Sequence, residues 1–213
     1  CIEILQIIVM RLNEEFTSIQ PNPITEIFFG QTRDQTVCPK CDYSTITYNL
    51  FSVLNLPFAN GKNKIKDFYN KWSSWQRQSK QDARVCEMCS NKFRIKTKNS
   101  VWTLPLILLI SIPRYNNEQK NAEIEIPRNL NASFLIEDQN DEKVQKYSLF
   151  AYINHFELKN FRHYVCHANV GNRKWDQNEI FASKVPPLWI EFDDTNYKKK
   201  AALVHSAPYA YLY

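Results

Sequence analysis

The chain has 213 residues, a formal net charge of +5, 44% hydrophobic residues and 23% charged residues. This composition is that of an ordinary globular protein, and it excludes a disordered tail, a collagen-like chain and a coiled coil. Only three glycines are present, which excludes the glycine-rich loops that bind phosphates in nucleotide enzymes. The longest apolar run, residues 104–112, is too short to cross a bilayer, and we recognise no secretory signal, so we expect no membrane partner.

The predicted elements change from helical to mostly β-structure along the chain. Residues 2–16 place apolar side chains near helical spacing and predict an amphipathic helix packed on a core through Ile4, Leu5, Ile8, Leu12 and Phe16. Residues 26–30 predict a short strand, residues 45–56 a longer strand, and residues 64–78 a short helix. Further segments rich in β-branched and aromatic residues predict strands at 93–104, 104–112, 124–126, 147–154, 163–170, 188–192 and 209–213. The C-terminal half is therefore expected to be mainly antiparallel β-structure.

Four of the six cysteines form two CxxC pairs, namely Cys38 with Cys41 and Cys86 with Cys89. A CxxC turn places two thiolates on one edge of a tetrahedron, and a second CxxC completes a four-cysteine zinc site of the ribbon type. Disulfide bonds are the competing explanation, but nothing else in the chain is typical of a secreted protein. The spacing therefore predicts a structural zinc ion and a reducing compartment, either the cytoplasm or the nucleus.

Residues 61–99 are strongly basic, with eleven Lys or Arg and three acidic residues. Such a segment attracts phosphate backbones, acidic proteins or anionic lipid, although a solvated lysine-rich surface gives the same pattern. A zinc-ribbon module that binds nucleic acid or an acidic protein partner is therefore the alternative function, with Trp72 and Trp75 as stacking platforms. Their spacing is also that of core residues on a short helix, and we do not expect a nucleic-acid partner.

A histidine on one predicted strand and a carboxylate on another are candidates for acid–base chemistry. His163 opens the strand at residues 163–170, and Asp193 and Asp194 follow the strand at residues 188–192. Opposite side chains on neighbouring strands stand about 5 Å apart, so these groups can meet across a sheet. Such a pair is two thirds of a nucleophilic triad. A structural hydrogen bond between histidine and aspartate would leave the same pattern.

Six stretches, in order, resemble the ubiquitin-specific proteases, a papain-like family of cysteine deubiquitinases. They are IFFGQ; CPKC, FSVLNLPF and CEMC together; LPLILLISIPRY; YSLFAYINH followed by RHY; WIEFDD; and YAYLY. The resemblance implies an α+β fold, with a palm of antiparallel strands and an inserted four-cysteine zinc-ribbon fingers subdomain. It implies an N-terminal helix and entry to the palm in residues 1–35, fingers in residues 36–100 and a palm with the histidine box in residues 101–213.

The same resemblance implies hydrolysis of the isopeptide bond at the ubiquitin C-terminus, with ubiquitin or a ubiquitinated protein as partner. It makes His163 the general base, Asp193 the group that orients it and Asp194 a helper. It assigns zinc to Cys38, Cys41, Cys86 and Cys89, and it places Arg162 and Tyr164 beside the substrate. The family usually has glycine at the position of Arg162, where backbone lies close to the substrate tail.

The nucleophile of the family has no counterpart in this sequence. The family's cysteine box lies well before the helix that residues 2–16 resemble, and Cys1 aligns with a different pattern. Cys166 lies three residues after His163 and therefore on the opposite face of the same strand. We expect the chain to be inactive alone, either as a truncated copy or as a pseudoenzyme that binds ubiquitin. An upstream segment or a partner would then complete the cleft.

Overall fold

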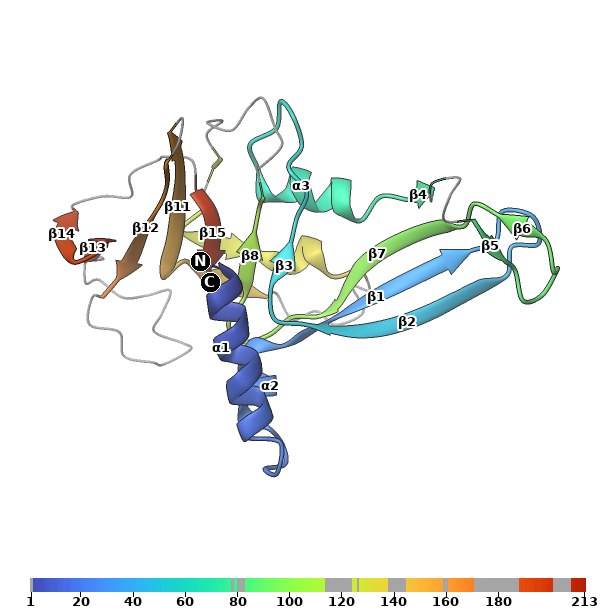
Figure 1. Cartoon of the computed structure of the whole chain (residues 1–213), viewed down its shortest axis with the longest axis horizontal. Coiled ribbons are helices and arrows are strands. Elements are labelled where there is room, and N and C mark those ends of the chain that lie inside the picture. Colours follow the sequence, from blue (N-terminus) through green and yellow to red (C-terminus); the bar gives the residue numbers. More distant parts are fainter. Residues whose placement is uncertain are drawn as a thin grey trace.

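The computed structural model describes residues 2–77, 79, 83–113, 124–125, 127–137, 145–158, 161–170, 188–200 and 208–213. In these ranges the chain forms a broad seven-stranded sheet and a long, narrow four-stranded sheet that projects away from it (Figure 1). We call them the large sheet and the projecting sheet. Helices cover parts of both, which confirms the α+β class. None of the described helices has the length and apolar character that a bilayer crossing requires.

Two helices open the chain, α1 (Ile2–Glu15) and α2 (Pro23–Phe28). Asn22 caps α2, because its side-chain oxygen accepts hydrogen bonds from the backbone N–H groups of Ile24 and Thr25 at 2.9 and 3.4 Å. The amide nitrogen of the same side chain donates to the carbonyl of Asn13 at 3.1 Å. This bond ties the start of α2 to the last turns of α1.

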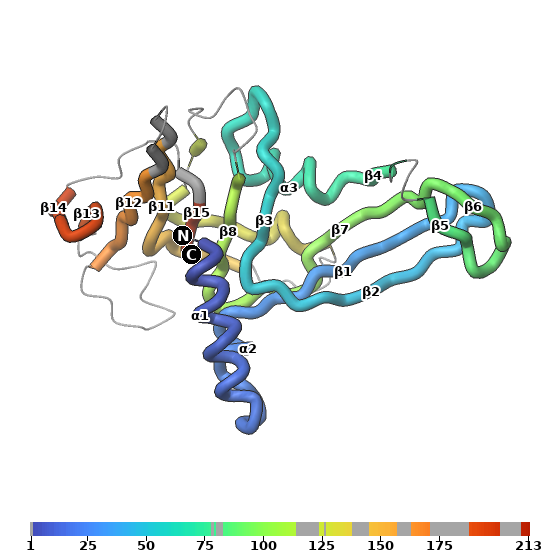
Figure 2. Tube along the Cα trace, viewed as in Figure 1, coloured from blue at the N-terminus to red at the C-terminus, as the bar shows by residue number. Residues whose placement is uncertain are grey.

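Helix α1 lies against the large sheet mainly through its first turn. Ile2 joins a core cluster that includes Ala210 of the last strand, in the region where Figure 2 marks both chain ends. The predicted helix is confirmed, but its predicted packing is wrong in part. Ile4 and Ile8 are 63% and 50% exposed, and the fully buried positions of the helix are Ile2 and Val9.

The projecting sheet has the strand order β2-β1-β7-β4. Its strands are β1 (Gly30–Val37), β2 (Ser44–Phe51), β4 (Gln76–Arg77) and β7 (Lys96–Thr103). Strand β1 lies at its centre and pairs antiparallel with β2 and β7 along its length. A short hairpin of β5 (Arg84–Val85) and β6 (Lys92–Phe93) forms a further pair, drawn near the far end of the sheet in Figure 1.

The large sheet has the strand order β14-β13-β12-β11-β15-β8-β3. Its strands are β3 (Leu54–Asn55), β8 (Leu109–Ser111), β11 (Ala151–Leu158), β12 (Phe161–Asn169), β13 (Trp189–Asp193), β14 (Asn196–Lys200) and β15 (Pro208–Leu212). All neighbours are antiparallel except β3 and β8. Strand β12 lies between β11 and β13, so its side chains are flanked by neighbours on both sides.

The main core lies where the two sheets meet. Helix α3 (Ile65–Trp72) buries Phe68 there, and the hydroxyl of Tyr69 donates to the carbonyl of Leu135 at 2.5 Å. Leu135 ends the 3₁₀-helix η1 (Ala132–Leu135), which follows β9 (Asn129–Asn131); β9 pairs with β10 (Lys146–Ser148). The same cluster contains Ile110 of the large sheet. This core holds the strands that carry the site.

The structure corrects one expectation about the first hundred residues. The strand predicted at residues 26–30 is wrong, because Asn22 and Pro23 start a helix that runs to Phe28. The division into fingers at residues 36–100 and palm at residues 101–213 stays a prediction. The projecting sheet starts at Gly30 and ends at Thr103, whereas β3 and α3, inside that range, belong to the large sheet and the main core.

Gly30 begins β1 at the root of the projecting sheet, where a larger residue has no room. A Cβ atom there would lie 2.5 Å from the carbonyl oxygen of Thr103 and 2.6 Å from the ring of Phe51. We expect Gly30→Ala to lower the free energy of unfolding by about 1–3 kcal/mol, because backbone must move. Gln31→Ala is the control and should change stability by less than about 1 kcal/mol. Urea unfolding followed by tryptophan fluorescence measures both, and equal midpoints would contradict the close contact.

Candidate active site and metal centre

His163 of β12 and Asp193 of β13 point toward each other from neighbouring strands. The His163 Nε2 atom lies 2.5 Å from Asp193 Oδ1. The imidazole is 23% exposed and the carboxylate 48% exposed, so the pair lies at the surface of the sheet. The register of β12 and β13 explains why His163 and Asp193 are in contact. Cys166 pairs with Phe192, which puts Asp193 one residue beyond the last β12–β13 pair and diagonally across from His163.

This contact fixes which imidazole nitrogen can act as a base. A carboxylate only accepts hydrogen bonds, so Nε2 of His163 donates to Asp193. Nδ1 is then the basic nitrogen of the neutral ring. A ring held in one tautomer by a carboxylate is the arrangement that takes a proton from a thiol or hydroxyl.

Asp194 lies beside this pair, in the turn between β13 and β14. Its carboxylate is within 4.8 Å of the His163 nitrogen and of the Asp193 carboxylate. Its backbone has φ +51°, in the left-handed region, which aspartate and asparagine tolerate better than most residues. The positive φ of the turn therefore explains an aspartate at position 194 without any role in catalysis.

The two remaining predicted site residues flank His163 on β12. The backbone of Arg162 pairs with Glu157 of β11, and the Arg162 side chain lies outside the described atoms. Tyr164 projects to the opposite face from His163, where its ring stacks on His155 with the ring centroids 4.5 Å apart. The structure therefore does not bring Tyr164 to the His163–Asp193 pair.

Cys166 is the described cysteine closest to His163 in sequence, and it lies on the other face of β12. It packs against the core cluster that contains Ile153, and burial raises the pKa of its thiol. The other described cysteines gather in one cluster, formed by the turn between β1 and β2 and the turn between β5 and β6, and Cys1 lies outside the described residues. Among the cysteines that the structure describes, none is placed to act with His163.

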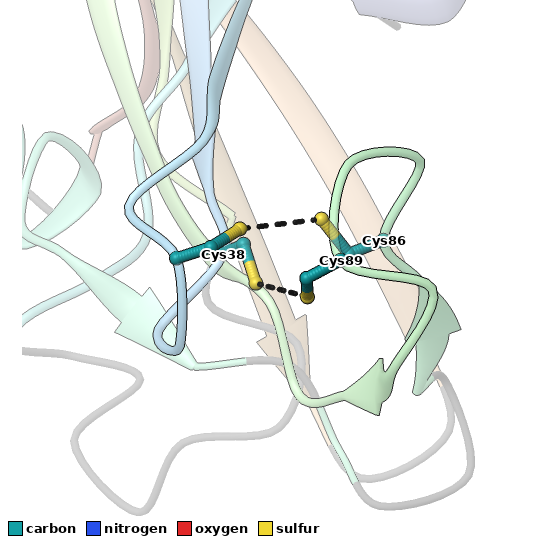
Figure 3. A group of neighbouring side chains, drawn as sticks. Cys38, Cys86 and Cys89 are labelled. Atoms are coloured by element: carbon teal, nitrogen blue, oxygen red, sulfur yellow. Dashed lines mark hydrogen bonds between the residues drawn. The ribbon is translucent and has the colours of Figure 1, made fainter.

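The two CxxC pairs come together into a single four-sulfur cluster (Figure 3). The Sγ atoms of Cys38 and Cys89 lie 3.9 Å apart, and those of Cys41 and Cys86 lie 3.7 Å apart. Zinc–sulfur bonds of about 2.3 Å in a tetrahedron require an edge of about 3.8 Å between sulfurs. All four sulfurs lie within 4.8 Å of one another, so the cluster has the size and donor set for a tetrahedral metal ion.

The same backbone turn presents both cysteine pairs. In the first turn Asp42 N–H donates to the Cys38 carbonyl at 3.0 Å, and in the second Ser90 N–H donates to the Cys86 carbonyl at 2.8 Å. Asp42 and Ser90 both have positive φ, at +56° and +54°. Each follows the second cysteine of its pair directly. The two turns are therefore equivalent, which the spacing of the cysteines alone could not establish.

The four thiols differ in how readily they ionise. Backbone N–H groups of Lys40 and Cys41 lower the pKa of Cys38, and the backbone of Asn91 lowers that of Cys89 to about 6. The backbone of Tyr43 acts the same way on Cys41. Burial and the other three thiols outweigh it and raise the pKa of Cys41 to about 12. A bound cation would relieve this repulsion and allow all four to be thiolates.

The basic segment contributes an open groove near the cysteine cluster. It is lined by Pro39, Arg77, Ala83, Lys92, Phe93 and Arg94. Of the two tryptophans considered as stacking platforms, Trp72 packs on Tyr69 at 5.7 Å and against the main core, while Trp75 is 49% exposed. Trp72 thus packs against the core, which weakens the interpretation of Trp72 and Trp75 together as stacking platforms for nucleic acid.

A second histidine–acid contact lies on the same face of the sheet, and the sequence analysis did not single it out. His167 is directly opposite Glu191, with Nε2 and Oε2 3.9 Å apart. The sequence spacing of these residues already indicated that they share a face. His167 follows His163 by four residues and Glu191 precedes Asp193 by two, so all four share one face of their strands.

Comparison with known proteins decides the family. A family model described as ubiquitin carboxyl-terminal hydrolase matches residues 1–213. The chain belongs to the ubiquitin carboxyl-terminal hydrolase family. Human ubiquitin carboxyl-terminal hydrolase 21 is 25% identical over 174 residues, covering 76% of this chain and 30% of that protein. Ubiquitin carboxyl-terminal hydrolase 4 of Saccharomyces cerevisiae is 24% identical over 226 residues, covering 94% of this chain and 23% of that protein. The chain therefore spans less than a third of either relative.

Solved structures show the same fold. The SAGA Ubp8/Sgf11/Sus1/Sgf73 DUB module bound to ubiquitin aldehyde matches with a TM-score of 0.72 and 18% identity, over 99% of this chain and 48% of that chain. A structure of the DUB module bound to monoubiquitin gives a TM-score of 0.73 over 99% of this chain and 47% of that chain. The predicted membership of the deubiquitinase family and the predicted fold class are thus confirmed.

The turn role of Asp194 can be separated from a role for its charge. Asp194→Asn keeps a residue that tolerates positive φ and removes the charge, so it should leave the free energy of unfolding within about 0.5 kcal/mol of wild type. Asp194→Val places a β-branched residue at positive φ and should cost about 1–3 kcal/mol. Thermal unfolding of the two variants measures the difference, and a destabilised asparagine variant would show that the carboxylate itself matters.

Proposed function

We propose that this chain is the part of a cysteine deubiquitinase that supplies the general base and the four-cysteine metal site. Hydrolysis of the isopeptide bond at the ubiquitin C-terminus is the reaction. The observation that carries the proposal is the 2.5 Å contact between His163 Nε2 and Asp193 Oδ1 in a chain of the ubiquitin carboxyl-terminal hydrolase family. Family membership makes a structural hydrogen bond the weaker explanation of that contact.

In this proposal His163 takes the proton of a cysteine thiol through Nδ1 and later returns it to the leaving amine. Asp193 keeps the ring in the required tautomer and stabilises the imidazolium form. The thiol comes from a segment or partner that the structure does not describe, because Cys166 faces away and the other described cysteines form the metal cluster. The chain alone is then inactive and completes a cleft together with that segment.

Zinc is the metal that best fits the four-cysteine cluster. Cys38, Cys41, Cys86 and Cys89 would hold it as thiolates, since four sulfur ligands in a tetrahedral arrangement are typical of structural zinc. The ion would have no part in the reaction and would join the turn after β1 to the turn between β5 and β6. A thiolate site of this kind also favours a reducing compartment, the cytoplasm or the nucleus.

Ubiquitin, free or attached to a protein, is the proposed partner. The related DUB module was solved bound to ubiquitin aldehyde and to monoubiquitin, and the curated relatives carry the name of ubiquitin hydrolases. Arg162, directly before His163 on β12, and Tyr164, directly after it, are the proposed substrate-side residues. Tyr164 lies on the face opposite His163, so its contact with a substrate would be separate from the catalytic pair.

The activity proposal is tested with ubiquitin that carries an electrophile at its C-terminus. The chain alone should form no covalent adduct, and the chain joined to a segment that supplies the cysteine should form one. In the joined protein His163→Gln should lower the rate of adduct formation by about 10²–10⁴-fold, because the general base is lost. His155→Gln is the control, since His155 lies on the opposite face. An adduct with the chain alone, or a fully active His163→Gln variant, would contradict the proposal.

The zinc proposal is tested by metal content and hydrogen exchange. Purified protein should contain a single zinc ion, and Cys86→Ser should lose it, because three thiolates bind zinc less tightly than four. Removal of the metal with a chelator should speed amide exchange in β5, β6 and the turn at Cys38, with little change in β12. Cys166→Ser is the matched control. Zinc loss in that variant, or unchanged exchange after chelation, would count against the site.

A further inference from the structure

A line of side-chain contacts crosses four strands of the large sheet, on the face that carries His163. It runs from Tyr152 of β11 through His167 of β12 and Glu191 of β13 to Lys200 of β14. The rings of Tyr152 and His167 stack with centroids 4.5 Å apart and planes 6° apart. Glu191 Oε2 lies 3.9 Å from His167 Nε2 and 3.0 Å from Lys200 Nζ.

The line is mostly buried, so its charges need internal partners. The His167 side chain is 3% exposed and that of Glu191 18% exposed, while Lys200 at the outer end is 31% exposed. Asn154 Nδ2 lies 3.1 Å from His167 Nε2, the nitrogen that also faces Glu191. Burial lowers the pKa of His167, which favours the neutral imidazole, although Glu191 opposes it. Lys200 is therefore the cation that balances Glu191.

Asp193 depends on this line for its position. The β12–β13 ladder pairs residues 166–169 with residues 189–192 and ends there. Asp193 lies past that end and pairs only with Asn196 of β14. Its distance from His163 therefore depends on how the β13–β14 hairpin is seated on β12. Glu191, two residues earlier on the same face, is the charged side chain that contacts both β12 and β14.

We propose that Glu191 is a positioning residue. Its carboxylate, between the His167 ring and the Lys200 ammonium, holds the β13–β14 hairpin against β12 so that Asp193 reaches His163. The inference rests on the proposed role of Asp193 in orienting His163. If Glu191 were replaced by a neutral residue, the new side chain would lie beside the buried His167 ring and could not pair with Lys200. The hairpin would then lose the one ion pair that crosses from β14 to β13 on this face among the described residues.

The test reads the His163–Asp193 hydrogen bond directly, without a nucleophile. A strong imidazole–carboxylate hydrogen bond gives a low-field N–H proton resonance, and with four histidines in the chain it can be assigned in ¹⁵N-histidine-labelled protein through His163→Gln. Glu191→Gln and Lys200→Met should lose this resonance or exchange it rapidly with water. Lys199→Met is the matched control, because Lys199 is exposed and has the opposite orientation on the same strand. It should keep the wild-type signal.

The outcomes separate positioning from stability and from the proposed function. Loss of the resonance in both Glu191→Gln and Lys200→Met, with a retained melting transition and an unchanged Lys199→Met spectrum, supports the proposal. A wild-type His163 resonance in either variant overturns it, even if the melting temperature falls.

In a protein completed with the nucleophile, Glu191→Gln should lower kcat roughly tenfold or more with little change in KM, because the base is misplaced. A completed protein that never hydrolyses ubiquitin but shows the expected spectra would refute the function and leave the positioning role standing.

Discussion

The antiparallel pairing of β12 with β13 is the constraint on which the site depends. Side chains alternate between the two faces of a strand, so a register shift of one residue would send Asp193 to the face opposite His163. The pairing is short, but Trp189 at its start is 2% exposed and packs into the main core, which leaves little freedom for such a shift. The face of the sheet on which the Asp193 carboxylate lies is thus set by a tryptophan buried four residues earlier.

The same alternation divides the histidine segment into two sets with different surroundings. His163 and His167 face the acidic side chains of β13, while Tyr164 and Cys166 face the core cluster near α1. A thiol on the second set cannot serve an imidazole on the first, however close the two are in sequence. This is why the nearest described cysteine to His163 is excluded by geometry, and why a nucleophile must approach on the face that carries His163.

Much of the site could be predicted because its signals are local, whereas the elements that sequence analysis missed are set by their neighbours. The two CxxC pairs need only their spacing to be interpreted, whereas the roles of His163 and Asp193 were predicted from the resemblance of RHY and WIEFDD to motifs of the family. Strand β1 reads GQTRDQTV and has no apolar alternation; it is a strand because β2 and β7 pair with it. The helix at residues 23–28 is decided by one capping asparagine in a segment whose apolar residues suggest a strand. The exposure of Ile4 and Ile8 likewise depends on what packs against α1, which periodicity cannot reveal.

The projecting sheet and the large sheet are held together by different physical means. Strand β2 is exposed along both faces up to its last residue, and Phe51 and Val101 at the root are the residues of the projecting sheet's described strands that reach the main core. Backbone pairing of this kind, with little buried apolar area beneath it, is marginal in water. The sulfur cluster lies at the end that has no such core, where a metal ion can supply the folding free energy that apolar burial does not. The His163–Asp193 pair lies on the other sheet, over the main core, so loss of the metal has no direct physical route to it.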